Sequence, residues 1–456
     1  MRHHLKNFAF FVLSGGSALV LLLVLSLAAT LGVAHAQAPL SALTLPAAEA
    51  LLTQKNRDII LARRVQEQAG ADILTAGQRP NPQLSWTTQN INPNRGIGTG
   101  DVRAKTVDSI VRIDQLIERG GKAELRTETA RRLEGAAGED VAEITRQQLL
   151  ALRFAYFDVL AAQDKVAASA ESAALFGKTA DAAQLRLKAG DLAAADVARI
   201  RVDVLRAQND ARTAEADLSR ARVYLGLLIG AELEAASIRA VTAWPKPDAA
   251  AVPVGATAGS PAGATAGFTA LAEQRIDTRP DVRAARARVA AADKARELAQ
   301  SLRTRDVSVG LQYEHWPNRA DANNQGTGNS FGVAFSVPLF LRHNNEGEIA
   351  RAQADWYAAR DALERVLGVA RGEALRSVSD LAAARERLMR FENELVKEAE
   401  RAAAAAEFAF KNGAIGVMDL LDSRRILKAI QIDAANARGD HAKALAAFAL
   451  SAGGMP

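Results

Sequence analysis

Residues 188–201 read KAGDLAAADVARIR, and residues 411–424 read KNGAIGVMDLLDSR. In each stretch a lysine is followed two positions later by glycine and eight positions later by aspartate. The matched pairs, all 223 residues apart, are Lys188 with Lys411, Gly190 with Gly413, and Asp196 with Asp419. A constant offset of this kind indicates an internal repeat. Glycine at the end of a helical pattern marks a reversal between two helices, where a positive φ is needed.

The same offset holds outside these two stretches. Residues 56–63 (NRDIILAR) align with residues 279–286 (RPDVRAAR), and the match extends over roughly 180 residues. An Ala-, Gly- and Pro-rich stretch at 249–268 separates the two copies, as a linker does. The predicted organisation is a signal peptide at 1–36, repeat 1 at 37–230, a linker or equatorial segment at 231–268, and repeat 2 at 269–456.

The N-terminus carries an export signal. A basic start, MRHHLK, precedes an apolar run, and the run ends at Ala34-His35-Ala36, a small-residue site of the kind that signal peptidase cleaves. A permanent membrane anchor is the alternative, because the apolar run is long enough to span a bilayer. The sequence contains no cysteine, so disulfides and a lipid-modified N-terminal cysteine are excluded.

Each repeat is predicted to contain two short strands followed by two long helices. Alternating apolar and polar residues indicate the strands, and a polar loop joins the two strands of each pair. The helices follow from long segments without proline; one of ~64 residues would be a rod of roughly 95 Å. The predicted strands are 82–92, 105–117, 305–315 and 330–341, and the predicted long helices are 120–188, 191–229, 347–411 and 414–451.

The second long helix of each repeat has the spacing of a coiled coil. From Ala193 to Leu228, apolar residues recur at alternating intervals of four and three, which predicts a seam packed against a neighbouring helix. The copy in repeat 2 keeps this pattern except at His441, for which we expect a hydrogen-bonded packing role.

Four half-apolar strands in one chain cannot close a barrel, and open sheet edges are not tolerated in lipid. Strands of this length with aromatic ends suit an outer-membrane wall. The sequence therefore predicts that several chains pool their strands into one barrel, with the helices continuing below it as a tube. A soluble hairpin cap on a coiled-coil rod is the alternative.

This order of elements resembles the outer-membrane factor family typified by TolC, also called outer membrane efflux proteins. The segments RPNPQLSW, IDQLIERGGK and LRFAYFDVLAAQ are most similar to its CzcC-like heavy-metal efflux branch. The resemblance implies a mainly α fold with a small β part, assembled as a homotrimer. Its 12-stranded outer-membrane barrel would stand on a periplasmic α-helical tunnel.

The resemblance also implies a function and partners. The chain would be the outer-membrane exit channel of a tripartite system, with a periplasmic adaptor, an inner-membrane resistance-nodulation-division pump and outer-membrane lipid as partners. Its cargo would be divalent heavy-metal cations. A drug-efflux or type I secretion channel of the same fold, and a periplasmic coiled-coil interaction protein, are the alternatives.

The residues expected to carry this function lie at the two helix reversals. In TolC-like channels two aspartates line the periplasmic constriction, and the segment VMDLLDS places Asp419 and Asp422 at the matching positions. We add Asp196 as their partner in repeat 1, and we expect Arg199, Arg424 or Arg425 to restrain the closed tips. The residues expected to dock the adaptor are Lys188, Gly190, Leu192, Lys411, Gly413 and Ile415.

Other chemistry finds no support in the sequence. Histidine and methionine are sparse, and no phosphate-binding loop or nucleophile elbow is present. Basic and acidic residues alternate along the helices, so the net charge of +5 does not indicate a nucleic-acid surface. We therefore predict a passive channel that is not an enzyme and that has no cofactor and no resident metal.

Overall fold

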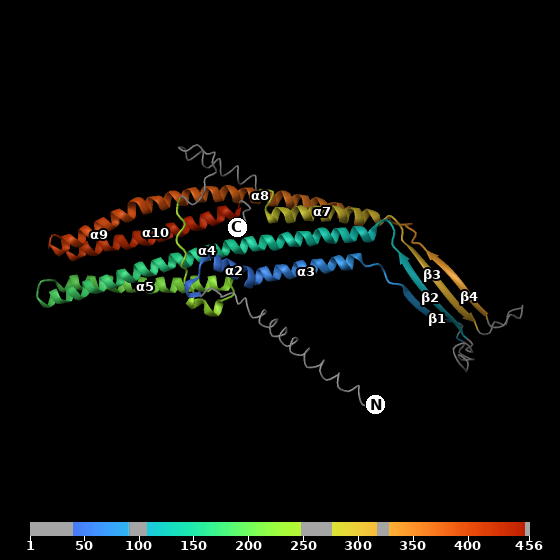
Figure 1. Ribbon diagram of the computed structural model, residues 1–456, viewed down its shortest axis with the longest axis horizontal. Helices are drawn as coiled ribbons and strands as arrows, with labels where there is room; N and C mark the ends of the chain where they lie inside the picture. Colours follow the sequence, from blue (N-terminus) through green and yellow to red (C-terminus); the bar gives the residue numbers. More distant parts are fainter. Residues whose placement is uncertain (1–39, 90, 92–106, 248–275, 317–327, 452–456) are drawn as a thin grey trace, which may run out of the picture.

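The computed structural model describes residues 40–89, 91, 107–247, 276–316 and 328–451. The predicted signal peptide and most of the predicted linker lie outside these ranges. The helices form one elongated body, and a sheet extends from one of its ends (Figure 1). The strands are β1 (Gln83–Gln89), β2 (Asp108–Ile117), β3 (Val307–Trp316) and β4 (Gly328–Ser336). The α-helices are α2 (Leu45–Lys55), α3 (Arg57–Gly77), α4 (Lys122–Lys188), α5 (Ala194–Leu228), α7 (Pro280–Ser301), α8 (Glu346–Arg390), α9 (Val396–Lys411) and α10 (Val417–Ser451), and the short elements are η1 (Leu40–Ala42), η3 (Glu232–Ser237) and η4 (Phe391–Leu395).

The four strands form one antiparallel sheet in the order β1-β2-β3-β4. The register places Trp86, Val111, Tyr313 and Phe331 in one row across the sheet. The adjacent row, on the opposite face, contains polar residues, among them Ser85, Arg112 and Gln312. The predicted alternation is thus confirmed. The apolar side chains that the single chain leaves exposed on this sheet include Leu84, Trp86, Val111, Ile113, Leu311, Phe331, Val333 and Phe335.

Strand β4 is shorter than predicted. The sequence predicts a strand to residue 341, but the strand ends at Ser336. Pro338 follows, and because proline has no N–H to donate to a ladder, pairing stops here. Residues 337–341 remain apolar and exposed at Val337, Leu339 and Leu341.

A compact junction connects the sheet to the helices. Gly120 and Gly121 have φ values of 77° and 68°, and a Cβ on Gly120 would lie 2.9 Å from Cβ of Thr304. The chain can therefore turn sharply between β2 and α4. Directly after the turn, Nζ of Lys122 donates to Oδ1 of Asp306 and to the carbonyl oxygen of Thr304, both at 2.8 Å. The pair joins the start of α4 to the segment before β3.

The acids of this junction are held in the charged form. Burial alone would raise the pKa of the Asp306 carboxyl, but hydrogen bonds from Lys122 and from the backbone N–H of Arg119 lower the pKa overall. The pKa of Glu118 is lowered by its paired hydrogen bonds with the guanidinium of Arg126, at 2.5 and 2.9 Å.

The main core lies midway along the long helix α4, which at 1.5 Å per residue is roughly 100 Å long. Tyr156 of α4 is fully buried, and its hydroxyl donates to the carbonyl oxygen of Leu43 at 2.8 Å. Leu43 in turn pairs with Ala240 in an isolated parallel bridge. The segments before α2 and after η3 are thereby fastened to the same part of α4.

The predicted coiled-coil seams are present. Helix α5 runs back along α4, and α10 lies beside α9, α8 and α4 (Figure 1). Buried seam positions of α5 are Val197, Ile200, Ala207, Ala214, Leu218, Leu225 and Leu228. Those of α10 are Leu420, Leu427, Ala434, Ala437 and Ala444. Among the described residues, no helix combines the length and apolar character needed to cross a membrane.

The expectation of one unbroken helix over 347–411 is wrong in one turn, and His441 packs in the interior as expected but without the expected hydrogen bond. The π-helical turn η4 separates α8 from α9 and faces α10. His441 of α10 is only 1% exposed, yet neither ring nitrogen has a hydrogen-bond partner among the described residues. The pKa of His441 is lowered, first by burial and then by the positive charge of Arg385, against a smaller opposite effect of Glu392.

This burial predicts a pH-dependent loss of stability. In the unfolded chain a histidine takes up a proton below about pH 6.5, whereas folded His441 resists protonation. Stability should therefore fall as the pH drops below that value. In His441→Leu this contribution is absent, so the decrease in melting temperature from about pH 7.5 to 5.5 should be smaller than in wild type. At neutral pH the variant should be more stable by about 1–3 kcal/mol, because two unsatisfied polar atoms are removed.

Circular dichroism melts of both proteins would measure this difference. His343→Leu is the matched control, since His343 is exposed. An equal pH response in wild type and His441→Leu would contradict the prediction.

Candidate functional site

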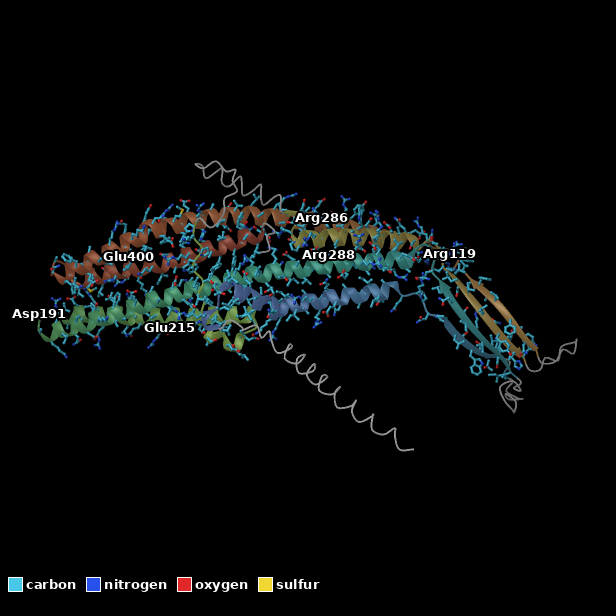
Figure 2. The ribbon with its side chains drawn as sticks, viewed as in Figure 1. Arg119, Asp191, Glu215, Arg286, Arg288 and Glu400 are labelled. Atoms are coloured by element: carbon cyan, nitrogen blue, oxygen red, sulfur yellow. The ribbon has the colours of Figure 1, made fainter. Side chains whose placement is uncertain are left out.

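The two helix reversals lie side by side at the end of the molecule farthest from the sheet, where Figure 2 labels Asp191. The first joins α4 to α5, and the second joins α9 to α10. We refer to residues 188–196 as tip 1 and residues 411–419 as tip 2.

Both tips have the same backbone geometry. Gly190 and Gly413 have φ values of 83° and 73°, which confirms the predicted left-handed conformation. In tip 1 the N–H of Asp191 donates to the carbonyl oxygen of Arg186 at 2.9 Å, and in tip 2 the N–H of Ala414 donates to that of Ala409 at 2.9 Å. This is a Schellman termination, which needs glycine at the reversing residue. A side chain at either glycine would be strained although the space around it is open.

The residues proposed for docking differ in exposure. Lys188 and Lys411 are exposed, whereas Leu192 and Ile415 are only half-exposed. Leu192 packs against a buried cluster formed by α4, α5 and α10. It also lines a small cavity of about 180 Å³ between the two tips, together with Phe410 and Val417. Leu192 therefore contributes to holding tip 1 against tip 2.

The three aspartates lie at the starts of α5 and α10. Asp419 and Asp422 are both exposed and stand three residues apart on α10. Oδ2 of Asp419 accepts the backbone N–H of Gly416 at 3.2 Å, so this carboxylate also caps its helix. Asp422 forms an ion pair with Arg425. Asp196 lies 3.9 Å from Arg199 on its own helix.

Of the three arginines considered as restraints, only Arg425 links the two hairpins. Its Nη2 lies 3.1 Å from Oδ2 of Asp203 on α5, and Asp203 is buried. Arg424 pairs with Glu407 within the α9–α10 hairpin. One turn beyond Arg425, Lys428 lies 2.7 Å from Asp210 of α5.

An apolar contact accompanies these ion pairs. Leu421 is 0% exposed and packs into a cluster with Phe176 of α4 and with Val197 and Ile200 of α5. Sequence reasoning missed this contact and the roles of Asp203 and Asp210. An acid inside the α5 seam segment was the available signal, but the spacing along one helix does not identify a partner on another.

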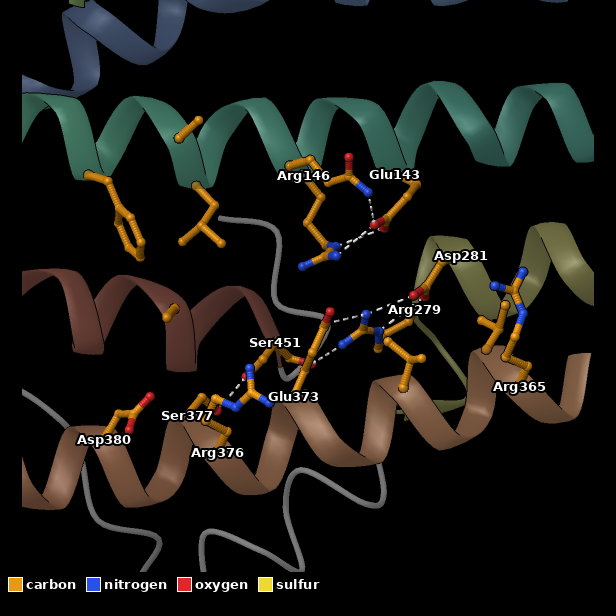
Figure 3. A pocket seen from close by; sticks show the side chains of 17 residues that line it. Glu143, Arg146, Arg279, Asp281, Arg365, Glu373, Arg376, Ser377, Asp380 and Ser451 are labelled. Carbon is orange, nitrogen blue, oxygen red and sulfur yellow. Dashed lines mark hydrogen bonds and ion pairs between the residues drawn. The ribbon is translucent and has the colours of Figure 1, made fainter. Parts of the chain in front are cut away.

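A second feature that the sequence did not predict is a charged cavity of about 700 Å³ between α4, α8 and the end of α10 (Figure 3). Arg279 at its wall is 1% exposed, and its Nη2 lies 2.7 Å from Asp281 and 2.9 Å from Glu373. Burial would lower the pKa of Arg279, but these hydrogen bonds raise it overall. Across the cavity, Arg146 pairs with Glu143 at 2.6 Å. Nη1 of Arg279 also donates to the carbonyl oxygen of Ser451 at 3.4 Å, so this cluster fastens α7 and α8 to the end of α10.

No group of three or more metal-ligating side chains is placed to hold an ion within the part of the chain that the structure describes.

Residues 271–454 match the model of the outer membrane efflux protein family. The chain is also 27% identical over 403 residues to the cobalt-zinc-cadmium resistance protein CzcC of Cupriavidus metallidurans, covering 84% of each protein. Residues 271–454 thus form an outer membrane efflux protein domain. The similarity to these efflux proteins indicates a protein of the outer membrane and not an enzyme.

Several solved structures have the same fold as this chain. The outer-membrane channel OprN matches with a TM-score of 0.70 at 21% identity, covering 90% of each chain. VceC of Vibrio cholerae matches with a TM-score of 0.69 at 17% identity, covering 90% of this chain and 96% of that one. CusC matches with a TM-score of 0.69 at 15% identity, covering 90% of this chain and 92% of that one.

The contact between the hairpins predicts a local effect of Leu421→Ala. Deleting a fully buried leucine side chain costs about 2–5 kcal/mol, and the loss should fall on the contact between α10 and α5. Amide hydrogen exchange in residues 194–210 should therefore become faster. Leu420→Ala is the matched control, because Leu420 is buried on the same helix but outside this cluster. Equal exchange in the two variants would contradict the proposed contact.

Proposed function

We propose that this protein is the outer-membrane exit channel of a tripartite efflux system and that it passively conducts divalent heavy-metal cations from the periplasm to the exterior. The observation that supports the channel most directly is the sheet. It exposes an apolar face, while β1 and β4 each pair with one neighbouring strand, so both outer edges are unpaired within the described part of the chain. Unpaired edges are not stable in lipid.

The edges would be satisfied if β1 of one chain paired with β4 of the next in a homotrimer, giving a 12-stranded barrel. In this arrangement the apolar face would point to lipid and the polar face to the lumen. The helices would form a periplasmic tunnel, with both tips at its mouth. The two halves of the chain would be tandem repeats, a proposal supported by the matching geometry of the two tips.

The partners follow from the proposed orientation. Tips at the mouth of the tunnel would face a periplasmic adaptor, which connects the channel to an inner-membrane resistance-nodulation-division pump. Exposed Lys188 and Lys411 and half-exposed Ile415 would contact the adaptor. Leu192 would act from beneath, by holding tip 1 in place.

The proposed cargo rests on the similarity to a protein named for cobalt, zinc and cadmium resistance. Deleting the gene from its natural host should lower tolerance to at least one of these divalent cations several-fold, with more of that metal retained in the cell. Growth assays and elemental analysis would measure both effects. Complementation with the wild-type gene is the control. Sensitivity to antibiotics or detergents with unchanged metal tolerance would instead favour a drug-efflux channel.

Within the trimer, Asp419 and Asp422 from three chains would form two rings of carboxylates one helical turn apart, near Asp196. Such rings attract and bind cations. In planar bilayers, Asp419→Asn with Asp422→Asn should weaken cation selectivity and relieve block by multivalent cations. Conductance should rise as well, because cations held at the carboxylate rings no longer slow passage.

Arg425→Gln separates the change in conductance from the change in cation selectivity. It removes the contact with Asp203 but leaves both carboxylates, so it should raise conductance and keep cation selectivity. Arg424→Gln is its matched control, since this neighbouring arginine pairs only within its own hairpin. Wild-type selectivity in the double aspartate variant would show that the carboxylates are structural.

A further inference from the structure

We propose that Arg119, Arg305 and Arg342, at the junction of the sheet with the helices, bind the phosphate groups of anionic phospholipids in the leaflet that faces the periplasm. The assignment of the leaflet rests on the orientation in the proposed function. The three arginines are called the girdle below.

The girdle continues the apolar face of the sheet. Ile117 and Val307 are the last paired residues of β2 and β3. Arg119 lies two residues after Ile117, and Arg305 lies two residues before Val307; both are exposed. By the two-residue period of the strands, the side of the sheet that would contact acyl chains is therefore followed by two cations. Figure 2 labels Arg119 at this end of the helical body.

The segment after β4 brings in the third arginine. Leu339 and Leu341 are exposed, Leu341 to 84%, although they lie outside the strand. Exposed Arg342 follows directly, and the guanidinium of Arg305 lies 5.4 Å from the ring centre of Phe340. Apolar side chains and guanidinium groups thus alternate within a few residues. This pattern suits the boundary between acyl chains and headgroups.

The acids near the girdle already have partners. Glu118 is bound by Arg126, and Asp306 is bound by Lys122 and by the backbone N–H of Arg119. The side chains of Arg119, Arg305 and Arg342 form no ion pair with any described residue. Glu346 accepts the backbone N–H of Asn344 at 2.8 Å.

The opposite face of the sheet provides a contrast. Arg112 there has a carboxylate partner, because its Nη2 lies 2.7 Å from Oδ1 of Asp114. Both side chains cover Gly310, where a Cβ would lie 2.4 Å from that oxygen. The arginine that would face the lumen is therefore neutralised within the chain, whereas the arginines of the girdle are left for an external anion.

Phosphate is the anion that suits these groups. A guanidinium presents a planar fork of donors that matches two phosphate oxygens. A phospholipid supplies such a phosphate at the depth where its acyl chains contact Leu339 and Leu341. Each basic residue beside a membrane surface increases the affinity for anionic lipid about fivefold.

The test compares lipid binding by the purified full-length protein in detergent, measured by native mass spectrometry with phosphatidylglycerol and phosphatidylcholine as probes. Wild type should bind phosphatidylglycerol in preference to phosphatidylcholine. Arg119→Gln with Arg305→Gln and Arg342→Gln should lose most of that preference, at least about tenfold. The matched control is Arg201→Gln with Arg206→Gln and Arg212→Gln, three exposed arginines of α5, and should bind as wild type does.

Further measurements make each result decisive. The corresponding triple lysine variant retains the charge but lacks the planar fork of donors, so it should bind phosphatidylglycerol at an intermediate level. It also replaces the glutamine variant in the test if that variant does not assemble. Inorganic phosphate should displace little lipid, because it lacks acyl chains. The proposal is overturned by equal binding of the two lipids, by an unchanged girdle variant, by an equal loss in the α5 control, or by full displacement with phosphate. Single-channel conductance, recorded in parallel, tests the proposed channel separately, since a girdle variant without lipid preference should still conduct.

Discussion

A backbone N–H or C=O group without a partner is too costly to leave in hydrocarbon, and this constraint governs the whole architecture. The described residues form four strands, and the outer edges of β1 and β4 have no partner among these residues. The apolar face of the sheet is exposed at the same time. In the proposed channel, identical chains would supply the missing edges. A shared barrel would in turn require the helices below it to pack in a ring.

The helices meet that requirement by using small residues. The buried seams of α5 and α10 contain alanine at Ala207, Ala214, Ala434, Ala437 and Ala444, so that neighbouring helices can approach closely. A rod of roughly 100 Å also needs lateral support. In α4 this support comes from the core around Tyr156 and from two ion pairs with α7, Glu139 with Arg283 and Asp140 with Arg288. Polar contacts thus fasten the helices at a few defined points, while the seams provide continuous contact.

The sequence predicted those features that depend on neighbouring residues along the chain. The seam of α5 followed from its spacing, and the positive φ values of Gly190 and Gly413 followed from glycine at the end of each helical pattern. The end of β4 was misjudged because apolar alternation continues past Pro338, where hydrogen bonding cannot. Contacts between distant segments were not predictable. Periodicity in α10 cannot show that Arg425 meets Asp203, nor that His441 finds no hydrogen-bond partner among the residues that the structure describes.

Arg425 links two properties that the sequence analysis treated separately, namely cation binding at the tips and the contact between the two hairpins. Arg425 contacts Asp422 on its own helix and Asp203 on the neighbouring hairpin. Asp203 is buried, so the loss of its partner would leave a charge with little access to water, which is costly. Asp422 is exposed and can exchange its partner for a cation at small cost. In the proposed channel, a cation that binds Asp422 would therefore release Arg425 toward Asp203 and strengthen the contact between the hairpins. Cation binding at the mouth and the position of the tips are in this way coupled through one side chain.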